Sequence, residues 1–275
     1  MREGVRTLGE GMDRGVVAAI NARLQTAAAD HHVAIPWAIE SGSRAWGFPS
    51  PDSDYDCRFL FIRSLDDYAS PWRPRNVIET PLDPVLDVNG WDLIKAVQLA
   101  VNGNATVSEW LRSPIVYDGD PAFRDRLLAV VGQVADRAAI GRHYLHVGRD
   151  HWRSSGAEAG GECHLKRVFY ALRPAAALHW MAHHGGSSPP MNLGELLASA
   201  PPPEDVGQHV AELVATKALT RELGHGRIPE PVRGWVNEQF ATATGFDVPP
   251  HEREDRRNQA HREFLALVRV WGPRE

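Results

Sequence analysis

Residues 40–62, ESGSRAWGFPSPDSDYDCRFLFI, carry the strongest structural signal in the chain. A turn rich in glycine and proline, 41–51, is followed by alternating polar and apolar residues, which predict a β-strand over Asp54–Ile62. Successive side chains of a strand point to opposite faces, so Asp54 and Asp56 are expected on the same face. The alternate apolar side chains then face a core. The stretch therefore predicts a strand that presents two carboxylates side by side.

A carboxylate pair of this kind predicts a metal site. Two carboxylates repel each other unless a cation lies between them, and hard oxygen ligands favour Mg²⁺. Asp87, in a predicted strand over 85–89, is expected to be the third ligand, and Asp92, at the start of the next helix, is the alternative. With Asp54, Asp56 and Asp87 as metal ligands and catalytic residues, two Mg²⁺ ions are expected.

The turn before the strand is a candidate phosphate site. Gly42 and Ser43 follow a predicted strand and open a turn, where backbone N–H groups can point at a phosphate. Arg44 could reach phosphate or pair with Glu40, and both interpretations stay open. For Lys95, triphosphate contact and a local ion pair likewise stay open.

A second candidate nucleotide-binding group lies far along the chain. Lys166, Tyr170 and Arg173 fall at i, i+4 and i+7 of a predicted helix over 163–184, hence on one helical face. Two cations and an aromatic ring suit a triphosphate with a stacked base or ribose, although a solvated helix face is the simpler alternative. We favour nucleotide binding, with Lys217 as a weaker phosphate candidate.

The order of the predicted elements indicates an α+β protein. In the first part, a helix is expected over 13–31, with strands over 33–39, 54–62, 76–80 and 85–89 and a helix over 91–101 that Asn89 caps. Pro36 favours an edge strand or a bulge. Later helices are expected over 121–153, 163–184, 193–199, 205–223, 232–242 and 252–271. We predict a domain with a small mixed sheet and helices, 1–118, and an all-helical domain, 119–275.

Composition limits the class of protein. Of 275 residues, 43% are hydrophobic and 24% charged, which is typical of a soluble globular protein, and the net charge of -5 disfavours a general nucleic-acid-coating protein. The two cysteines are too few for a disulfide framework. Residues 1–15 lack the apolar segment of a signal peptide, and no run approaches the ~18 apolar residues of a membrane span. We therefore expect a cytoplasmic protein with no membrane partner.

The pattern Gly-Ser, ten residues, Asp-x-Asp resembles the signature of the polymerase-β nucleotidyltransferase superfamily. Five further segments resemble the bacterial nucleotidyltransferases of the YcgL type, which are grouped with the RNA-repair-associated (RlaP-like) proteins. They are Glu40-Ser-Gly-Ser-Arg-Ala-Trp-Gly-Phe48, Asp87-Val-Asn-Gly-Trp-Asp-Leu-Ile-Lys95, Gly103-Asn104, Glu109-Trp-Leu-Arg-Ser-Pro-Ile-Val-Tyr117 and Tyr170-Ala-Leu-Arg-Pro174. The resemblance spans roughly residues 35–220, with departures at Ala105, where proline is expected, and Val168, where an aromatic residue is usual.

This resemblance implies a polymerase-β-like nucleotidyltransferase domain followed by a helical domain, with Mg²⁺ and an NTP, expected to be ATP. The implied reaction moves a nucleoside monophosphate from the NTP to an acceptor hydroxyl. The family grouping weakly favours an RNA end as acceptor. The alternatives are a protein or small-molecule adenylyltransferase, or a nucleotide-binding regulator without catalysis. The sequence gives no oligomeric state.

Overall fold

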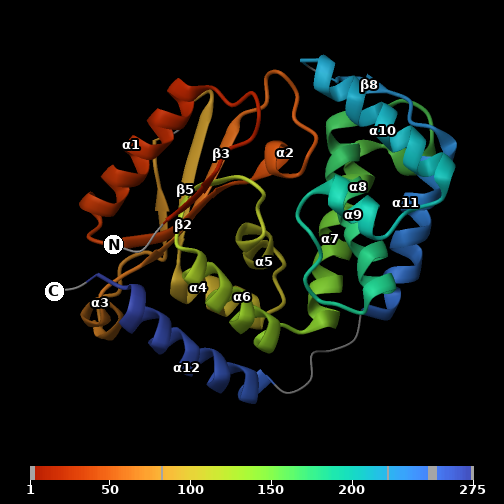
Figure 1. Cartoon of the computed structure of the whole chain (residues 1–275). Coiled ribbons are helices and arrows are strands. Elements are labelled where there is room, and N and C mark those ends of the chain that lie inside the picture. The colour runs from red at the N-terminus through yellow and green to blue at the C-terminus, as the bar shows by residue number, and fades with distance from the viewer. Residues whose placement is uncertain (1–3, 82, 222, 247–252, 274–275) are drawn as a thin grey trace.

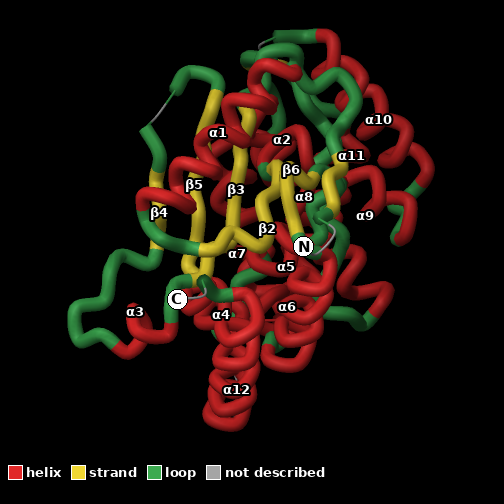
Figure 2. The backbone as a smooth tube through the Cα atoms, turned by 60° about the vertical axis from the view of Figure 1, so that its left-hand side comes forward, coloured by secondary structure: helices red, strands yellow, loops and turns green. Residues whose placement is uncertain are grey.

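A six-stranded mixed sheet forms the centre of the first half of the chain (Figures 1 and 2). The computed structural model describes residues 4–81, 83–221, 223–246 and 253–273. The strands run in the order β1-β6-β2-β3-β5-β4, in which only β3 and β5 pair in parallel. Their bounds are β1 Val5–Thr7, β2 Ala34–Glu40, β3 Tyr55–Ile62, β4 Val77–Glu79, β5 Leu86–Asp92 and β6 Val116–Gly119.

Helices cover both faces of this sheet. Helix α1, Arg14–Asp30, packs on one face over alternate residues of β3 such as Cys57, Phe59 and Phe61. The opposite face carries α4 (Leu93–Val101), α5 (Thr106–Leu111), α6 (Pro121–Val134) and α12 (Arg253–Trp271). Because β3 is buried on both faces, its register against its neighbours is fixed by packing.

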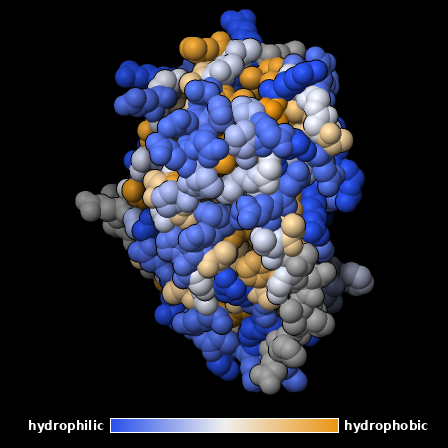
Figure 3. Space-filling view, turned by 90° about the vertical axis from the view of Figure 1, so that its right-hand side faces the viewer, coloured by the Kyte–Doolittle hydropathy of each residue, from blue (hydrophilic) through white to orange (hydrophobic). Residues whose placement is uncertain are grey.

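The remaining helices form a separate hydrophobic cluster beside the sheet. They are α7 (Arg137–Ser155), α8 (Leu165–His184), α9 (Leu193–Ser199), α10 (Glu204–Leu219) and α11 (Glu230–Thr242), with the short pair β7 (Cys163–His164) and β8 (His225–Gly226). Figure 3 faces this part of the molecule and shows a mostly hydrophilic exterior with scattered hydrophobic residues. The apolar helix faces are thus turned inward.

The mixed sheet and the abundance of helices agree with the predicted α+β class. The division into domains 1–118 and 119–275 stays a prediction. Two helices beyond residue 118, α6 and α12, pack with the sheet rather than with the second helical cluster. The chain therefore returns to the sheet at its end, which local periodicity does not reveal.

Three local predictions need correction or completion. The predicted cap at Asn89 is wrong, because β5 continues to Asp92, whose side chain accepts a hydrogen bond from the Ile94 N–H at the start of α4. Pro36 lies in an internal strand, and the pairing of β2 with β3 shifts register near it, as in the predicted bulge alternative. The short strands β1, β6, β7 and β8 were not predicted, because each has too few residues to show alternation.

In the part of the chain that the structure describes, no helix combines the length and the apolar character needed to cross a membrane.

Candidate active site

Two aspartates lie directly opposite each other on the parallel strands β3 and β5. Asp56 and Asp87 are partners in the β3–β5 register, and their side chains are about one-third exposed, at 31% and 33%. Asp54 lies just before β3 begins. Parallel strands in register bring side chains from distant parts of the sequence onto one face of a sheet. The structure therefore places the predicted third carboxylate, Asp87, beside Asp56.

Arg58 bridges this pair. Its Nη2 donates to Asp56 Oδ1 at 3.1 Å and to Asp87 Oδ2 at 2.6 Å. Its Nη1 donates to the Asp87 carbonyl at 2.8 Å, and Asn89 donates to the other carboxylate oxygen of Asp87. Residues two apart on a strand share a face, so the sequence did contain a signal for Arg58, but that residue was not predicted.

The pKa of Asp56 reflects the neighbouring acidic groups. Burial raises the pKa of Asp56, Arg58 lowers it, and the charges of Asp87 and Asp54 raise it again. This mutual repulsion and an all-oxygen donor set fit a hard divalent cation. Among the described residues, however, no three His, Cys, Asp or Glu side chains converge closely enough to hold an ion. The Arg58 guanidinium engages one oxygen of Asp56 and one of Asp87, the oxygens that a divalent cation between the two carboxylates would need.

The short helix α2, Gly42–Ala45, is tied closely to β3. Gly42 has a φ of +63°, and a Cβ atom there would lie 2.1 Å from Asp56 Oδ2, so only glycine fits this approach. The Ser41 N–H donates to the Asp56 carbonyl at 2.8 Å, and Ser43 Oγ donates to Ser53 Oγ at 2.9 Å. The glycine-serine turn and Asp56 thus form one local unit.

The side chain of Arg44 stabilises the loop that leads into β3. It donates to the carbonyl of Ser53 at 2.6 Å and to that of Asp54 at 3.2 Å, and it stacks over the Tyr55 ring at 4.0 Å. These contacts correspond to neither of the two interpretations left open for Arg44, although its charge lowers the pKa of nearby Glu40.

A buried carboxyl group, that of Glu40, is hydrogen-bonded to the backbone of β3. Glu40 is fully buried and accepts hydrogen bonds from the Asp56 N–H and the Tyr117 hydroxyl. Burial raises the pKa of Glu40 to about 7, despite these two hydrogen bonds. Glu40 therefore fixes the backbone of Asp56 without lying in the cavity that the aspartate lines.

A cavity of about 320 Å³ opens between the aspartates and the helical cluster. Its sheet-side lining includes Ser43, Asp54 and Asp56, and its helix-side lining includes Lys166 and Tyr170. The charge of Lys166 lowers the pKa of Asp56, whereas burial, and then Asp56 and Asp54, raise the pKa of Tyr170. Five predicted site residues from both halves of the chain thus face one another across one space.

Lys217, which the sequence suggested only as a weaker phosphate candidate, lines the cavity. Its side chain lines the cavity yet is only 4% exposed, and Nζ donates to the Phe48 carbonyl at 2.5 Å. Burial, followed by the charge of Lys166, lowers the pKa of Lys217 to about 8. Arg221, four residues on, and His164 also line the cavity. Neither was predicted, although the four-residue spacing of Lys217 and Arg221 was a usable signal.

Other predicted residues lie away from the cavity lining. Arg173 is buried in an ion pair with Glu109 at 2.6 Å, and Lys95 lies over the Trp91 ring at 4.8 Å. Asp92 is 2% exposed and is engaged by Arg63 at 3.4 Å. The structure thus gives Arg173 and Lys95 other partners, and it places Asp92 at the opposite end of β5 from Asp87.

The segment 46–48, at the end of α2, connects the two walls of the cavity by apolar packing and a backbone hydrogen bond. Phe48 is fully buried in the helical cluster, with its ring 5.1 Å from that of Phe169. The Leu193 N–H donates to the Trp46 carbonyl at 2.8 Å, and the Trp46 ring packs edge-on against Tyr170 at 5.4 Å. The relative position of aspartates and lysines therefore depends on a short apolar anchor.

The chain is similar to known proteins over most of its length. Residues 16–266 match the family described as RlaP, RNA repair pathway DNA polymerase beta family. The chain is also 36% identical over 191 residues to the uncharacterized protein YcgL of Bacillus subtilis strain 168, over 70% of this chain and 72% of that protein. The family match covers most of the chain, including every residue that lines the cavity. The chain therefore belongs to the RlaP family, the RNA repair pathway DNA polymerase beta family.

Proposed function

We propose that the protein is a Mg²⁺-dependent nucleotidyltransferase that moves a nucleoside monophosphate from an NTP, ATP by preference, to a hydroxyl group. One observation carries the proposal: aspartates on one wall of a cavity face Lys166, Lys217 and Arg221 on the other. A nucleoside triphosphate bound to divalent cations needs carboxylates for the cations and basic groups for the remaining phosphate charge. Family membership supports the same class of reaction.

In this proposal, one wall binds the metal ions and the other binds the phosphates. Asp54, Asp56 and Asp87 would hold two Mg²⁺ ions, which when bound supply charge stabilisation at the phosphates and a lower pKa for the attacking hydroxyl. On the opposite wall, Lys166 and Lys217 bind the phosphates through charge-assisted hydrogen bonds. Gly42 allows the backbone of the turn to approach a phosphate as closely as it approaches Asp56.

We propose an RNA end as the acceptor. The support is the family description, which refers to an RNA repair pathway. The cavity of about 320 Å³ is too small for an NTP and a folded acceptor together. An acceptor hydroxyl must therefore approach from the open side of the carboxylates, which suits a strand end. A hydroxyl group of a protein side chain or of a small molecule would have to approach from the same side. These acceptors differ from an RNA end only in the groups that surround the hydroxyl.

A nucleotide-binding regulator without catalysis is the second candidate, and the Arg58 bridge favours it. If the guanidinium stays between Asp56 and Asp87, it balances one of their two negative charges without a metal ion. Nucleotide would then bind to the helical wall alone. The two candidates differ in one measurable respect, which is whether label from the α-phosphate becomes covalently attached.

The deciding experiment incubates the protein with α-labelled ATP, GTP, CTP or UTP, Mg²⁺ and a defined RNA oligonucleotide. Parallel reactions offer a protein extract freed of nucleic acid, or a small-molecule extract. We expect label in the RNA, and its loss in Asp56→Asn. Label in protein or small molecules would retain the nucleotidyltransferase but replace the acceptor. Binding of NTP without label transfer to any acceptor would overturn catalysis in favour of the regulator.

A further inference from the structure

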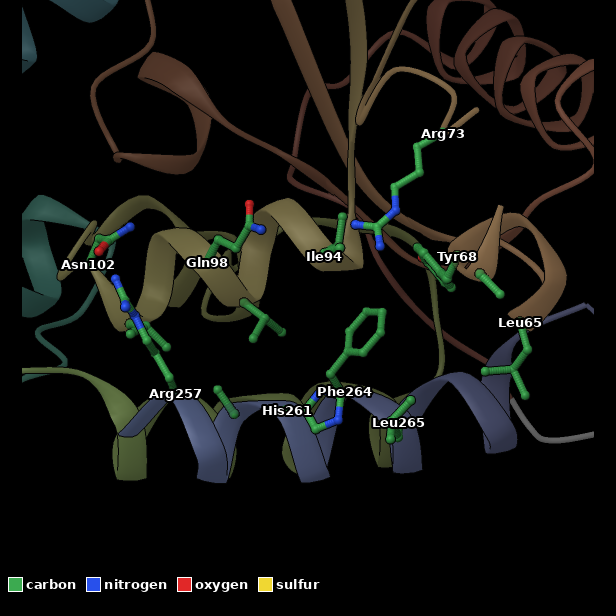
Figure 4. Close-up of a pocket in the computed structure, with 14 residues that line it drawn as sticks. Leu65, Tyr68, Arg73, Ile94, Gln98, Asn102, Arg257, His261, Phe264 and Leu265 are labelled. Atoms are coloured by element: carbon green, nitrogen blue, oxygen red, sulfur yellow. The ribbon is translucent and has the colours of Figure 1, made fainter. Parts of the chain in front are cut away.

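A cavity of about 730 Å³ lies at the other end of the strands, between α3 (Leu65–Ala69), α4 and α12 (Figure 4). Two of its walls follow directly from the strands that carry the aspartates, since β3 leads into α3 and β5 into α4. Asp56 lies near the start of β3, so the strand itself separates this groove from the active site. We call this cavity the α4–α12 groove.

The groove has an apolar interior of the size that binds small molecules. Phe264 of α12 rises toward α4 in Figure 4, and its ring packs edge-on against Tyr68 at 5.0 Å. The other apolar lining residues are Leu65, Ala69, Ile94, Val97, Val101, Ala260 and Leu265. Cavities of roughly 300–1,000 Å³ with such linings and a few polar groups are typical ligand sites.

The polar residues of the groove are all neutral or cationic. They include Arg73, Arg257 and His261, and no aspartate or glutamate lines the groove, although the chain as a whole carries a net charge of -5. Within the described residues, no hydrogen bond or ion pair engages Arg73 or Arg257. An arginine without a carboxylate partner beside an apolar cavity is complementary to an anionic group.

The lining differs between the two ends of the groove. Figure 4 shows Arg257 reaching up from α12 toward Asn102 at the end of α4, whereas Leu65, Tyr68 and Leu265 lie at the opposite end. The polar end therefore offers a guanidinium and an amide, and the other end offers only aliphatic and aromatic surface apart from Arg73 above it. A ligand with a charged group at one end and an apolar body at the other is complementary to both ends of the groove.

We propose that the α4–α12 groove binds an amphipathic monoanion, a small molecule with an alkyl or aryl body and a carboxylate or sulfonate head. The head binds Arg257 and Asn102, and the body lies along Val97, Phe264 and the α3 wall. The Tyr68 hydroxyl of that wall also donates to buried Asp92 at 2.7 Å, at the end of β5. An occupant that contacts Tyr68 is therefore one hydrogen bond away from the end of β5, the strand that also carries Asp87.

The test is isothermal titration calorimetry of the whole protein with sodium decanoate below its micelle concentration, and with 1-decanol. We expect saturable one-to-one binding of decanoate and at least tenfold weaker binding of the uncharged alcohol. Arg257→Gln should weaken decanoate binding about tenfold, from the loss of a charge-assisted hydrogen bond. Arg262→Gln is the matched control, because it removes the same charge from the same helix at a residue outside the groove lining.

A steric variant tests the apolar end separately. Ala69 is exposed at the rim of the groove, so Ala69→Trp should fold normally and abolish decanoate binding. Equal affinity for decanol and decanoate, equal effects of Arg257→Gln and Arg262→Gln, or no binding by a folded wild-type protein would each overturn the proposal. Since binding is measured directly and without nucleotide, these results are independent of the proposed nucleotidyl transfer.

Discussion

The two walls of the active-site cavity are built in different ways. The sheet wall is nearly local, since residues 43–56 supply all of its lining, whereas Arg58 and Asp87 lie next to Asp56 and outside that lining. The helical wall takes Lys166 from α8, Lys217 from α10 and Arg221 from the segment beyond α10. The first wall is fixed by backbone hydrogen bonds and the second by helix packing, so substitutions should affect them differently.

The largest effect is expected at the sheet wall. Asp56→Asn should lower nucleotidyl transfer by about 10³-fold or more, because it removes charge that must oppose the divalent cations in the transition state. The melting temperature should change little, since Asp56 is repelled by Asp54 and Asp87. Label transfer and thermal unfolding measure the two quantities.

Asp92→Asn is the matched control for that experiment. Asp92 is buried and engaged by Arg63 and Tyr68, so its substitution should lower the melting temperature more than it lowers transfer. A loss of transfer in Asp92→Asn equal to that in Asp56→Asn would show that the third carboxylate has been assigned to the wrong residue.

The junction between the walls should give the next largest effect. Phe48→Ala should destabilise the protein by about 3–5 kcal/mol, because a fully buried ring that packs on Phe169 leaves a cavity. Urea denaturation measures this free energy. Leu219→Ala, at a site 85% exposed, should change stability by no more than about 0.5 kcal/mol. Similar values for both variants would mean that the loop is not an anchor.

Removal of the bridge within the sheet wall should have a smaller effect that depends on metal. Arg58→Gln should lower stability by about 1–2 kcal/mol, because the carboxylates lose their counter-ion at a site that is partly screened by solvent. Added Mg²⁺ should then raise the melting temperature of Arg58→Gln more than that of the wild type. An equal rise in both proteins would contradict competition between the guanidinium and the cation.

At the helical wall, Lys166→Gln should weaken NTP binding about tenfold, the cost of one charge-assisted hydrogen bond, while stability stays within about 0.5 kcal/mol. Arg167→Gln removes the same charge one position along α8, where the side chain is exposed and donates to the Ser154 carbonyl. Fluorescence titration with a nucleotide analogue compares the two variants. Equal affinities would exclude Lys166 from the site.

The smallest expected effect is a pH dependence at Lys217. Burial lowers the pKa of this lysine to about 8, so its ammonium is present below pH 8 and is lost as the pH rises through that value. NTP affinity should therefore fall several-fold between pH 7 and 9, and less in Lys217→Arg, since arginine stays charged. Stability should change in the opposite direction, rising above pH 8 because the unfolded chain then binds more protons. An identical affinity profile in Lys217→Arg would contradict this assignment.

Local sequence was sufficient for much of the sheet wall. The alternation in 54–62 predicted the strand, and the two-residue spacing placed Asp54 and Asp56 together, because strand geometry has a period of two. Helices with amphipathic periodicity, such as α1 and α9, were also predicted close to their observed bounds. These features depend on interactions within a few residues.

Only the tertiary structure decided which charged groups meet. Asp87 rather than Asp92 lies beside Asp56 because β3 and β5 pair in parallel and in one particular register, which no local pattern specifies. Arg173 shares a helical face with Lys166 in the sequence, yet packing against Glu109 buries it away from the cavity, whereas Lys217 is drawn in. Helical and strand periodicity assign a face to a residue, but what that face meets depends on chain segments far away in the sequence.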